Sequence, residues 1–191
     1  RVGYASGEDV LFVLDRVGGF IAYKTSADNP IRYFEFSRTT LGDVNVAKAL
    51  VADRLGYVYV LDGGAGRVLK LHYNSSTRVF DTYSVLRNGL SNPSDMDIHY
   101  GSSLTDPNDD VLVIANTGAG NIITVNASNG QTIQTFTSYS YGYGPQTASI
   151  QVPVGVATTR WTYSPYIYVL IKQGTSYSVA SFNSSGTGGM A

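Results

Sequence analysis

A fourfold internal repeat constrains the fold of this chain more than any other feature. Four apolar segments that end at a polar residue occur at positions 10–15, 57–62, 111–116 and 167–172, and their last positions lie 47, 54 and 56 residues apart. Repeats of this period are supersecondary units, each of which buries its apolar face only against its neighbours. The spacing therefore predicts an array of similar units.

Each repeat is composed of segments with the two-residue period of β-strands. Small-residue segments such as 48–52 come first, and alternating segments such as 67–73 follow the apolar ones. β-branched and aromatic residues are enriched in both, as expected for strands. The dipeptide Asn129-Gly130 suits a tight hairpin turn, and no segment has the period of a helix. We expect an all-β fold.

Four antiparallel strands repeated at this period describe the blade of a β-propeller, in which short sheets are arranged around an axis. With 191 residues the chain is long enough for a single domain with a real core. We predict one β-propeller domain over residues 1–191, with blades at about 1–38, 46–86, 92–137 and 152–183 and a tail at 184–191.

The turns after the second strands resemble those of a known family. Residues 62–68 (Asp-Gly-Gly-Ala-Gly-Arg-Val) and 116–122 (Asn-Thr-Gly-Ala-Gly-Asn-Ile), with Tyr-Val-Tyr-Val-Leu at 57–61 and Pro-Val-Gly-Val-Ala at 153–157, are similar to NHL-type propeller repeats. The first and last repeats depart from this pattern at the equivalent turn. The resemblance covers nearly the whole chain and implies propeller architecture; it does not imply an activity.

The last repeat is short by one strand. The first three repeats contain four strand-like segments, whereas the tail that follows residue 182 has poor strand propensity. The tail consists of Ser184, Ser185, Gly186, Thr187, Gly188, Gly189, Met190 and Ala191. We therefore expect a four-bladed chain whose last blade lacks its outer strand. Three arrangements are open: the tail forms an irregular edge of its own ring, the chain is part of a larger propeller, or a neighbouring molecule supplies the strand by strand addition.

Composition narrows the classes of partner and the compartment. The net charge is −1 and only 14% of residues are charged, so the basic surface of a nucleic-acid binder is absent. The apolar runs are strand-sized, too short for a membrane helix. Three glycosylation sequons begin at Asn74, Asn126 and Asn183, each just after the third strand of its repeat. Their placement on one face of the array favours an extracellular or cell-surface protein.

Metal and catalytic motifs are sparse. Asp95 and Asp97 are two residues apart on a first strand, so their side chains point to the same side and fit a hard cation such as Ca²⁺, with His99 and Asp53 nearby in the repeat pattern. The alternative is that they solvate a channel or cap turns. Some lyases with NHL-like propellers hold zinc with several histidines, but this chain has two. No nucleophile elbow occurs among its serines, and we expect no other cofactor.

Aromatic residues are concentrated in the last third of the chain and suggest an interaction surface for protein or carbohydrate. They are Tyr139, Tyr141, Tyr143, Trp161, Tyr163 and Tyr166. We expect a non-enzymatic extracellular structural or adhesive propeller that self-assembles into a surface filament by strand or tail exchange, with copies of itself or a surface protein or glycan as partners. The alternatives are a calcium-dependent propeller hydrolase or lyase, and a monomeric sugar- or peptide-binding propeller.

Overall fold

The computed structural model describes residues 2–5, 8–15, 17, 19–25, 30–102, 106–140, 147–159, 166–183 and 188–190. These residues form eighteen β-strands and three short 3₁₀ helices, without an α-helix, so the prediction of an all-β fold is confirmed. None of these segments is a helix long and apolar enough to cross a membrane.

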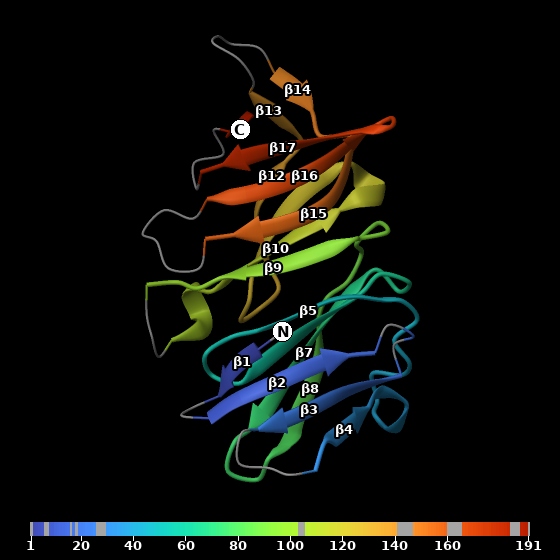
Figure 1. Cartoon of the computed structure of the whole chain (residues 1–191), viewed down its shortest axis with the longest axis vertical. Helices are drawn as coiled ribbons and strands as arrows, with labels where there is room; N and C mark the ends of the chain where they lie inside the picture. Colours follow the sequence, from blue (N-terminus) through green and yellow to red (C-terminus); the bar gives the residue numbers. More distant parts are fainter. Residues whose placement is uncertain are drawn as a thin grey trace.

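The strands build four four-stranded antiparallel sheets that follow one another along the chain (Figure 1). The first sheet contains β1 (Val2–Ala5), β2 (Glu8–Leu14), β3 (Phe20–Thr25) and β4 (Arg32–Glu35). The second contains β5 (Ala47–Ala52), β6 (Tyr57–Asp62), β7 (Arg67–Asn74) and β8 (Val79–Arg87). The third contains β9 (Asp95–His99), β10 (Val111–Asn116), β11 (Asn121–Asn126) and β12 (Thr132–Phe136). The fourth contains β15 (Val152–Thr158), β16 (Ile167–Gln173), β17 (Ser176–Phe182) and β18 (Gly188–Met190).

The remaining elements lie in the connections between strands. A two-stranded hairpin of β13 (Ser138–Ser140) and β14 (Thr147–Ser149) follows the third sheet and precedes the fourth along the chain. The helices are η1 (Phe36–Arg38), η2 (Pro107–Asp109) and η3 (Thr117–Ala119). In every four-stranded sheet the strands pair in chain order, so each sheet is an uninterrupted meander.

The prediction that the last sheet lacks its outer strand is wrong. Gly188, Gly189 and Met190 pair with Phe182, Ser181 and Ala180 of β17. Strand propensity measures mainly the packing of side chains, and a three-residue edge strand needs little more than backbone hydrogen bonds. The glycine-rich tail therefore completes its own sheet. Residues 184–187 and 191 of the predicted assembly tail lie outside the described part.

Consecutive sheets pack face to face through three apolar cores. The first core joins the first and second sheets and is rich in aromatic rings; its fully buried members include Phe12, Ile21, Val58, Val60, Leu69, Leu71 and Tyr73. The second joins the second and third sheets and includes Tyr59, Leu61, Met96, Ile98, Leu112 and Ile114. The third joins the third and fourth sheets and includes Val113, Ala115, Ile122, Val169, Ile171 and Phe182.

The two middle sheets are therefore buried on both faces, whereas the two end sheets are buried on one. Five consecutive residues of β6 and five of β10 are buried, which is the pattern of a strand covered on both sides. By contrast β16 alternates between buried and exposed residues. Figure 1 shows the first and fourth sheets at opposite ends of an elongated molecule, each in front of its neighbouring sheet.

Candidate functional site

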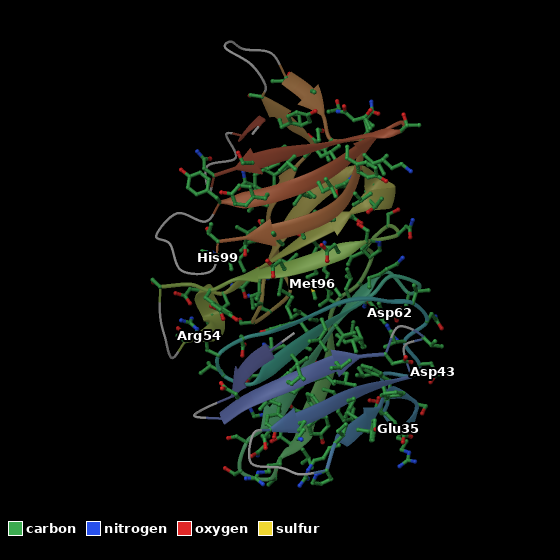
Figure 2. All side chains as sticks on the ribbon, in the orientation of Figure 1. Glu35, Asp43, Arg54, Asp62, Met96 and His99 are labelled. Atoms are coloured by element: carbon green, nitrogen blue, oxygen red, sulfur yellow. The ribbon has the colours of Figure 1, made fainter. Side chains whose placement is uncertain are left out.

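The first strands of successive sheets lie next to one another along the inner side of the array. Contacts join β5 to β1 and β2, β9 to β5, and β15 to β9. Because these strands belong to different sheets, no backbone ladder connects them. The polar side chains singled out in the sequence lie here: Asp53 directly follows β5, and β9 carries Asp95, Asp97 and His99. Figure 2 shows His99 and Met96 on β9, with Arg54 near the same end of the strands as His99.

The two carboxylates predicted as cation ligands bind the neighbouring strand. The backbone N–H of Val156 donates to Asp95 Oδ2 at 3.0 Å, and the backbone N–H of Thr158 donates to Asp97 Oδ2 at 3.0 Å. The two-residue period places both side chains on one side of β9, as expected. Each carboxylate serves a different amide of β15, and no group of three or more potential ligand side chains occurs among the residues that the structure describes.

His99 continues the same row of contacts between β9 and β15. Its Nδ1 lies 2.5 Å from the backbone oxygen of Thr159, and the Thr158 hydroxyl donates to the backbone oxygen of Ile98 at 2.9 Å. A ring nitrogen facing a carbonyl oxygen must carry the proton. We therefore assign the proton to Nδ1, and His99 links two sheets.

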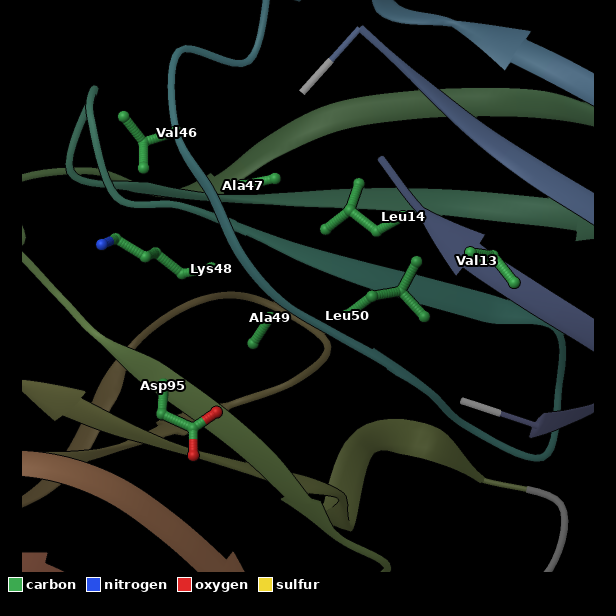
Figure 3. Close-up of a pocket in the computed structure, with 8 residues that line it drawn as sticks. All are labelled: Val13, Leu14, Val46, Ala47, Lys48, Ala49, Leu50 and Asp95. Carbon is green, nitrogen blue, oxygen red and sulfur yellow. The ribbon is translucent and has the colours of Figure 1, made fainter. Parts of the chain in front are cut away.

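A groove of about 590 Å³ opens on the inner side, between the first sheet and the first strands of the second and third sheets (Figure 3). Its walls are mostly aliphatic, and Lys48 and Asp95 supply the charged groups. The lining residues are Val13, Leu14, Val46, Ala47, Lys48, Ala49, Leu50 and Asp95. Lys48 is exposed, whereas Asp95 is half-buried. This lining suits a ligand with an apolar body and a polar group.

A second, smaller cavity of about 140 Å³ lies between the third and fourth sheets, and its lining is almost entirely apolar. His99 and Ile167 lie at its walls. A cavity of this size and lining is typical of imperfect packing between two sheets, whereas a site for a polar ligand would contain polar groups.

A buried polar network joins the second and third sheets at the end of the inner strands. Asp53 accepts hydrogen bonds from the backbone N–H groups of Leu55 and Tyr57, both at 2.8 Å, and from the Tyr59 hydroxyl at 3.2 Å. Burial is the main cause that raises the pKa of Asp53 to about 6, and the nearby carboxylate of Asp110 adds to the shift. A perturbed carboxyl is a candidate functional group, but Asp53 is 1% exposed and lines neither of the two cavities described above.

Asp110 is held by its own partners in the same network. It accepts hydrogen bonds from the backbone N–H of Gly101 at 2.8 Å and from Arg54 Nη2 at 3.3 Å. Burial raises its pKa, while Arg54 opposes the shift. The Arg54 guanidinium also lies 5.0 Å from the centre of the Tyr100 ring, and this geometry is that of a cation–π contact. These contacts hold two sheets together.

The glycine-rich turns of the second and third sheets bind the segment that precedes each of these sheets. Asp62 Oδ1 accepts from the N–H of Ala65 inside its own turn at 3.2 Å and from the N–H of Val46 at 3.4 Å, and Oδ2 accepts from Arg67 Nε at 3.0 Å. Arg67 in turn donates to the backbone oxygen of Leu41 at 2.9 Å. Asp62 thus binds the backbone of its own turn and also that of the preceding segment.

Asn116, at the equivalent position of the third sheet, binds the connection that leads from the second sheet into the third. Its Oδ1 accepts from the N–H of Ser91 at 2.7 Å, and its Nδ2 donates to Asn121 Oδ1 at 3.0 Å. The Gly118 N–H donates to the Ser91 backbone oxygen at 2.8 Å. Sequence reasoning missed this contact, because its partner lies 25 residues away in a segment without a motif.

Two of the predicted glycosylation asparagines form a repeated turn. Asn74 Oδ1 accepts from the N–H groups of Ser76 and Thr77, and Asn126 Oδ1 accepts from those of Ser128 and Asn129. Asn74 ends β7, Asn126 ends β11, and Asn183 directly follows β17. The asparagine at this corner therefore has a structural use of its own, since it shapes the hairpin to the fourth strand.

The described residues of the predicted aromatic surface lie in different environments. Tyr139 is 4% exposed in the third core, where its hydroxyl accepts a hydrogen bond from Gln173 Nε2 at 2.9 Å. It belongs to the interior because β13 packs against the fourth sheet. Tyr166, directly before β16, is 48% exposed. Tyr141, Tyr143, Trp161 and Tyr163 lie outside the described residues.

Comparison with known proteins supports the fold but names no family. No family model matches the sequence, and no curated protein matches it. Among solved structures, hydrazine synthase from Kuenenia stuttgartiensis superposes with a TM-score of 0.63 at 11% identity, over 100% of this chain and 47% of that chain. A luciferin-regenerating enzyme gives 0.56 at 16% identity, over 100% and 58%. An auxiliary nutrient binding protein from Bacteroides thetaiotaomicron gives 0.58 at 13% identity, over 84% and 42%.

The chain spans about half the length of these solved structures. At such low identity the likeness concerns the fold alone, and it places this all-β chain beside propeller-like, β-rich folds.

Proposed function

We propose that this chain is a non-enzymatic structural module built as four blades of a β-propeller, and that it works outside the cell. One observation carries the proposal: the acidic and imidazole groups of the inner strands are committed to holding neighbouring sheets. Asp95, Asp97 and His99 each contact the backbone of β15 or the residue after it. A catalytic or metal-binding propeller would need such groups directed at a substrate or ion.

Calcium titration tests this proposal against a calcium-dependent hydrolase or lyase. We expect the melting temperature to be the same in excess CaCl₂ and in EDTA, because a cation that bound only the folded state would raise it. Asp97→Asn is expected to lower the melting temperature equally in both buffers, since it weakens the acceptor for the Thr158 N–H. Stabilisation by calcium that disappears in Asp95→Asn or Asp97→Asn would refute the proposal in favour of the calcium site.

The inner groove supports a second candidate function, the binding of a small sugar or peptide. Lys48 and Asp95 carry opposite charges and line the groove together with aliphatic side chains. A panel of oligosaccharides and short peptides, read by melting temperature with wild type and Lys48→Ala, tests this function. A ligand that stabilises wild type but not Lys48→Ala supports binding in the groove, and equal stabilisation of both proteins contradicts it.

The extracellular part of the proposal rests on the three sequons at equivalent corners. Asn74 and Asn126 use Nδ2 as a hydrogen-bond donor, to Asp81 and to the Asn108 backbone oxygen respectively. A glycosylated amide keeps one N–H, so one such bond can persist after modification. Expression through a eukaryotic secretory pathway should give a protein whose electrophoretic mobility changes on treatment with an N-glycosidase. No change for the wild type would contradict this part of the proposal.

A further inference from the structure

The two end sheets each expose a set of apolar side chains on one face. On β2 of the first sheet, Leu11 is 47% and Val13 is 51% exposed, although Val10 and Phe12, which alternate with them, are buried. On β16 of the fourth sheet, Tyr168 is 40% and Leu170 is 38% exposed. Exposed apolar residues that share one face of a sheet mark a contact surface. We call these two surfaces the first-sheet face and the fourth-sheet face.

Further apolar residues extend both faces beyond a single strand. Val13 pairs with Ala22, and Ala22 pairs with Tyr33, which is 58% exposed. Leu170 pairs with Val179, which is 41% exposed. Direct cross-strand partners point to the same side of a sheet. Each face therefore crosses at least two strands.

The equivalent positions of the middle sheets are covered by a neighbouring sheet. Val58 and Val60 of β6 align with Leu11 and Val13, and both are fully buried in the first core. These positions are the side that receives a preceding sheet. The first-sheet face thus corresponds to the side on which a middle sheet packs against the sheet before it. Among the described residues, no sheet covers this side of the first sheet.

The fourth-sheet face is the complementary kind of surface. In the fourth sheet, Ile167, Val169 and Ile171 contact the third sheet, so Tyr168 and Leu170 lie on the side that would receive a following sheet. In the middle sheets that side is also covered, as Tyr59 and Leu61 contact the third sheet in the second core. A fourth-sheet face placed on a first-sheet face would repeat the packing found three times within the chain.

Both faces open toward the same side of the molecule. In Figure 1 the first sheet lies in front of the second, and the fourth lies in front of the third, so their uncovered faces both turn toward the viewer. The chain also spans 47% of the hydrazine synthase chain, which is about half of a propeller-like chain. One partner with the same shape, rotated by half a turn, meets both faces at once.

On the proposed four-blade architecture, we propose that a second copy of this chain docks on both faces and closes a two-copy ring. The first-sheet face of each copy packs on the fourth-sheet face of the other. The two interfaces are equivalent by the twofold axis, and together they cover the four exposed residues Leu11, Val13, Tyr168 and Leu170. An apolar interface of this kind excludes water from residues that the isolated chain leaves half exposed.

The mass of the unmodified chain in solution is the first test. Sedimentation or light scattering should give twice the 20.5 kDa mass of one copy, in equilibrium with single copies on dilution. Leu170→Glu places a charge in the interface and should weaken the association at least about tenfold. Val79→Glu is the matched control, because Val79 is 41% exposed on β8 of a middle sheet and lies on neither face. Single copies at all concentrations, or open-ended assemblies of more than two copies, would overturn the proposal.

Cross-linking tests which faces meet, and the chain suits it because it contains no cysteine. The double variant Leu11→Cys with Leu170→Cys should be joined into a two-copy species by a short bis-maleimide. Each single variant should remain uncross-linked, because the proposal places the two copies of either residue on different interfaces. Efficient cross-linking of a single variant, or none of the double variant, would contradict the pairing. The calcium titration reads a different property, so failure of the ring leaves the proposed function separately testable.

Discussion

Replacement of Asp53 by asparagine gives the sharpest test of how the interior polar network affects stability. Asp53 is 1% exposed and accepts two backbone hydrogen bonds on one oxygen and the Tyr59 hydroxyl on the other. In the folded chain its pKa is about 6, against an ordinary value of 3.8, chiefly because burial disfavours the ionised form. Asparagine keeps the oxygen that accepts from Leu55 and Tyr57 but carries no charge.

The sign of the effect follows from proton linkage. A carboxyl whose pKa is raised by folding binds a proton more tightly in the folded state, so its contribution favours folding at low pH. That contribution is lost as pH rises from about 3.8 to about 6 and is absent above this window. One pKa unit corresponds to about 1.4 kcal/mol, so a shift of roughly two units corresponds to about 3 kcal/mol. Asp53→Asn removes this pH-dependent loss.

Urea unfolding of wild type and Asp53→Asn at about pH 4 and about pH 8 measures the effect. The free energy of unfolding of the variant, relative to wild type, should increase by about 2.5 kcal/mol between the two pH values, because at pH 4 the unfolded carboxyl is already partly ionised. Asp81→Asn is the control, because hydrogen bonds from His72 and Asn74 lower the pKa of this exposed carboxyl, and its contribution is lost as pH falls. The reasoning is refuted if wild type and Asp53→Asn change stability in parallel over this range.

Four further predictions concern turns and the tail, and thermal unfolding measures all of them. Arg78 has a φ of 57°, at the turn position where the third sheet has Gly130, so Arg78→Gly should stabilise the chain by about 1 kcal/mol; a loss of stability would contradict the strain argument. Gly130→Ala should destabilise it by more than about 2 kcal/mol, because the new methyl group would lie 2.0 Å from the Leu86 backbone oxygen; a change within error would show that the turn relaxes. Asp62→Ala leaves Arg67 without its buried partner and should cost about 3 kcal/mol, more than Asp43→Ala on the exposed loop; equal effects would exclude the anchoring role. Removal of residues 184–191 should lower the melting temperature because β17 loses its edge partner, and an unchanged value would show that β18 contributes nothing.

The repeat pattern predicted the strands well because their apolar residues and turns recur locally. The repeat pattern does not predict which side of the last sheet is covered. Alignment of residues 167–172 with 111–116 matches Tyr168 to Leu112, yet Ile167, Val169 and Ile171 face the third sheet. Because side chains alternate, an offset of one residue exchanges the two faces of a strand. The turn between β16 and β17 is shorter than the equivalent turn between β10 and β11 of the third sheet. An alignment that matches the polar last residues of the apolar segments therefore does not reveal the offset.

The tail was misjudged for a related reason. Strand β18 consists of two glycines and a methionine, so side-chain propensity gives no indication of it. Its pairing depends on the free edge of β17, which only the assembled sheet provides. Tyr139 shows the same limit, since its segment looks like an exposed aromatic loop and becomes buried only because β13 packs against the fourth sheet.

The acidic pattern on β9 shows how one spacing serves two uses. Alternate aspartates on a strand suit a cation, but they equally suit amides on a neighbouring strand that has no ladder partner on that side. Here Asp95 and Asp97 accept the N–H groups of Val156 and Thr158 and replace a backbone ladder between two sheets. The first and second sheets, in contrast, are joined by an aromatic core, in which Phe12 lies 5.6 Å from Tyr73. The sheet boundaries therefore differ in their chemistry, and ionic conditions that weaken charged hydrogen bonds should loosen the third and fourth sheets before the first and second.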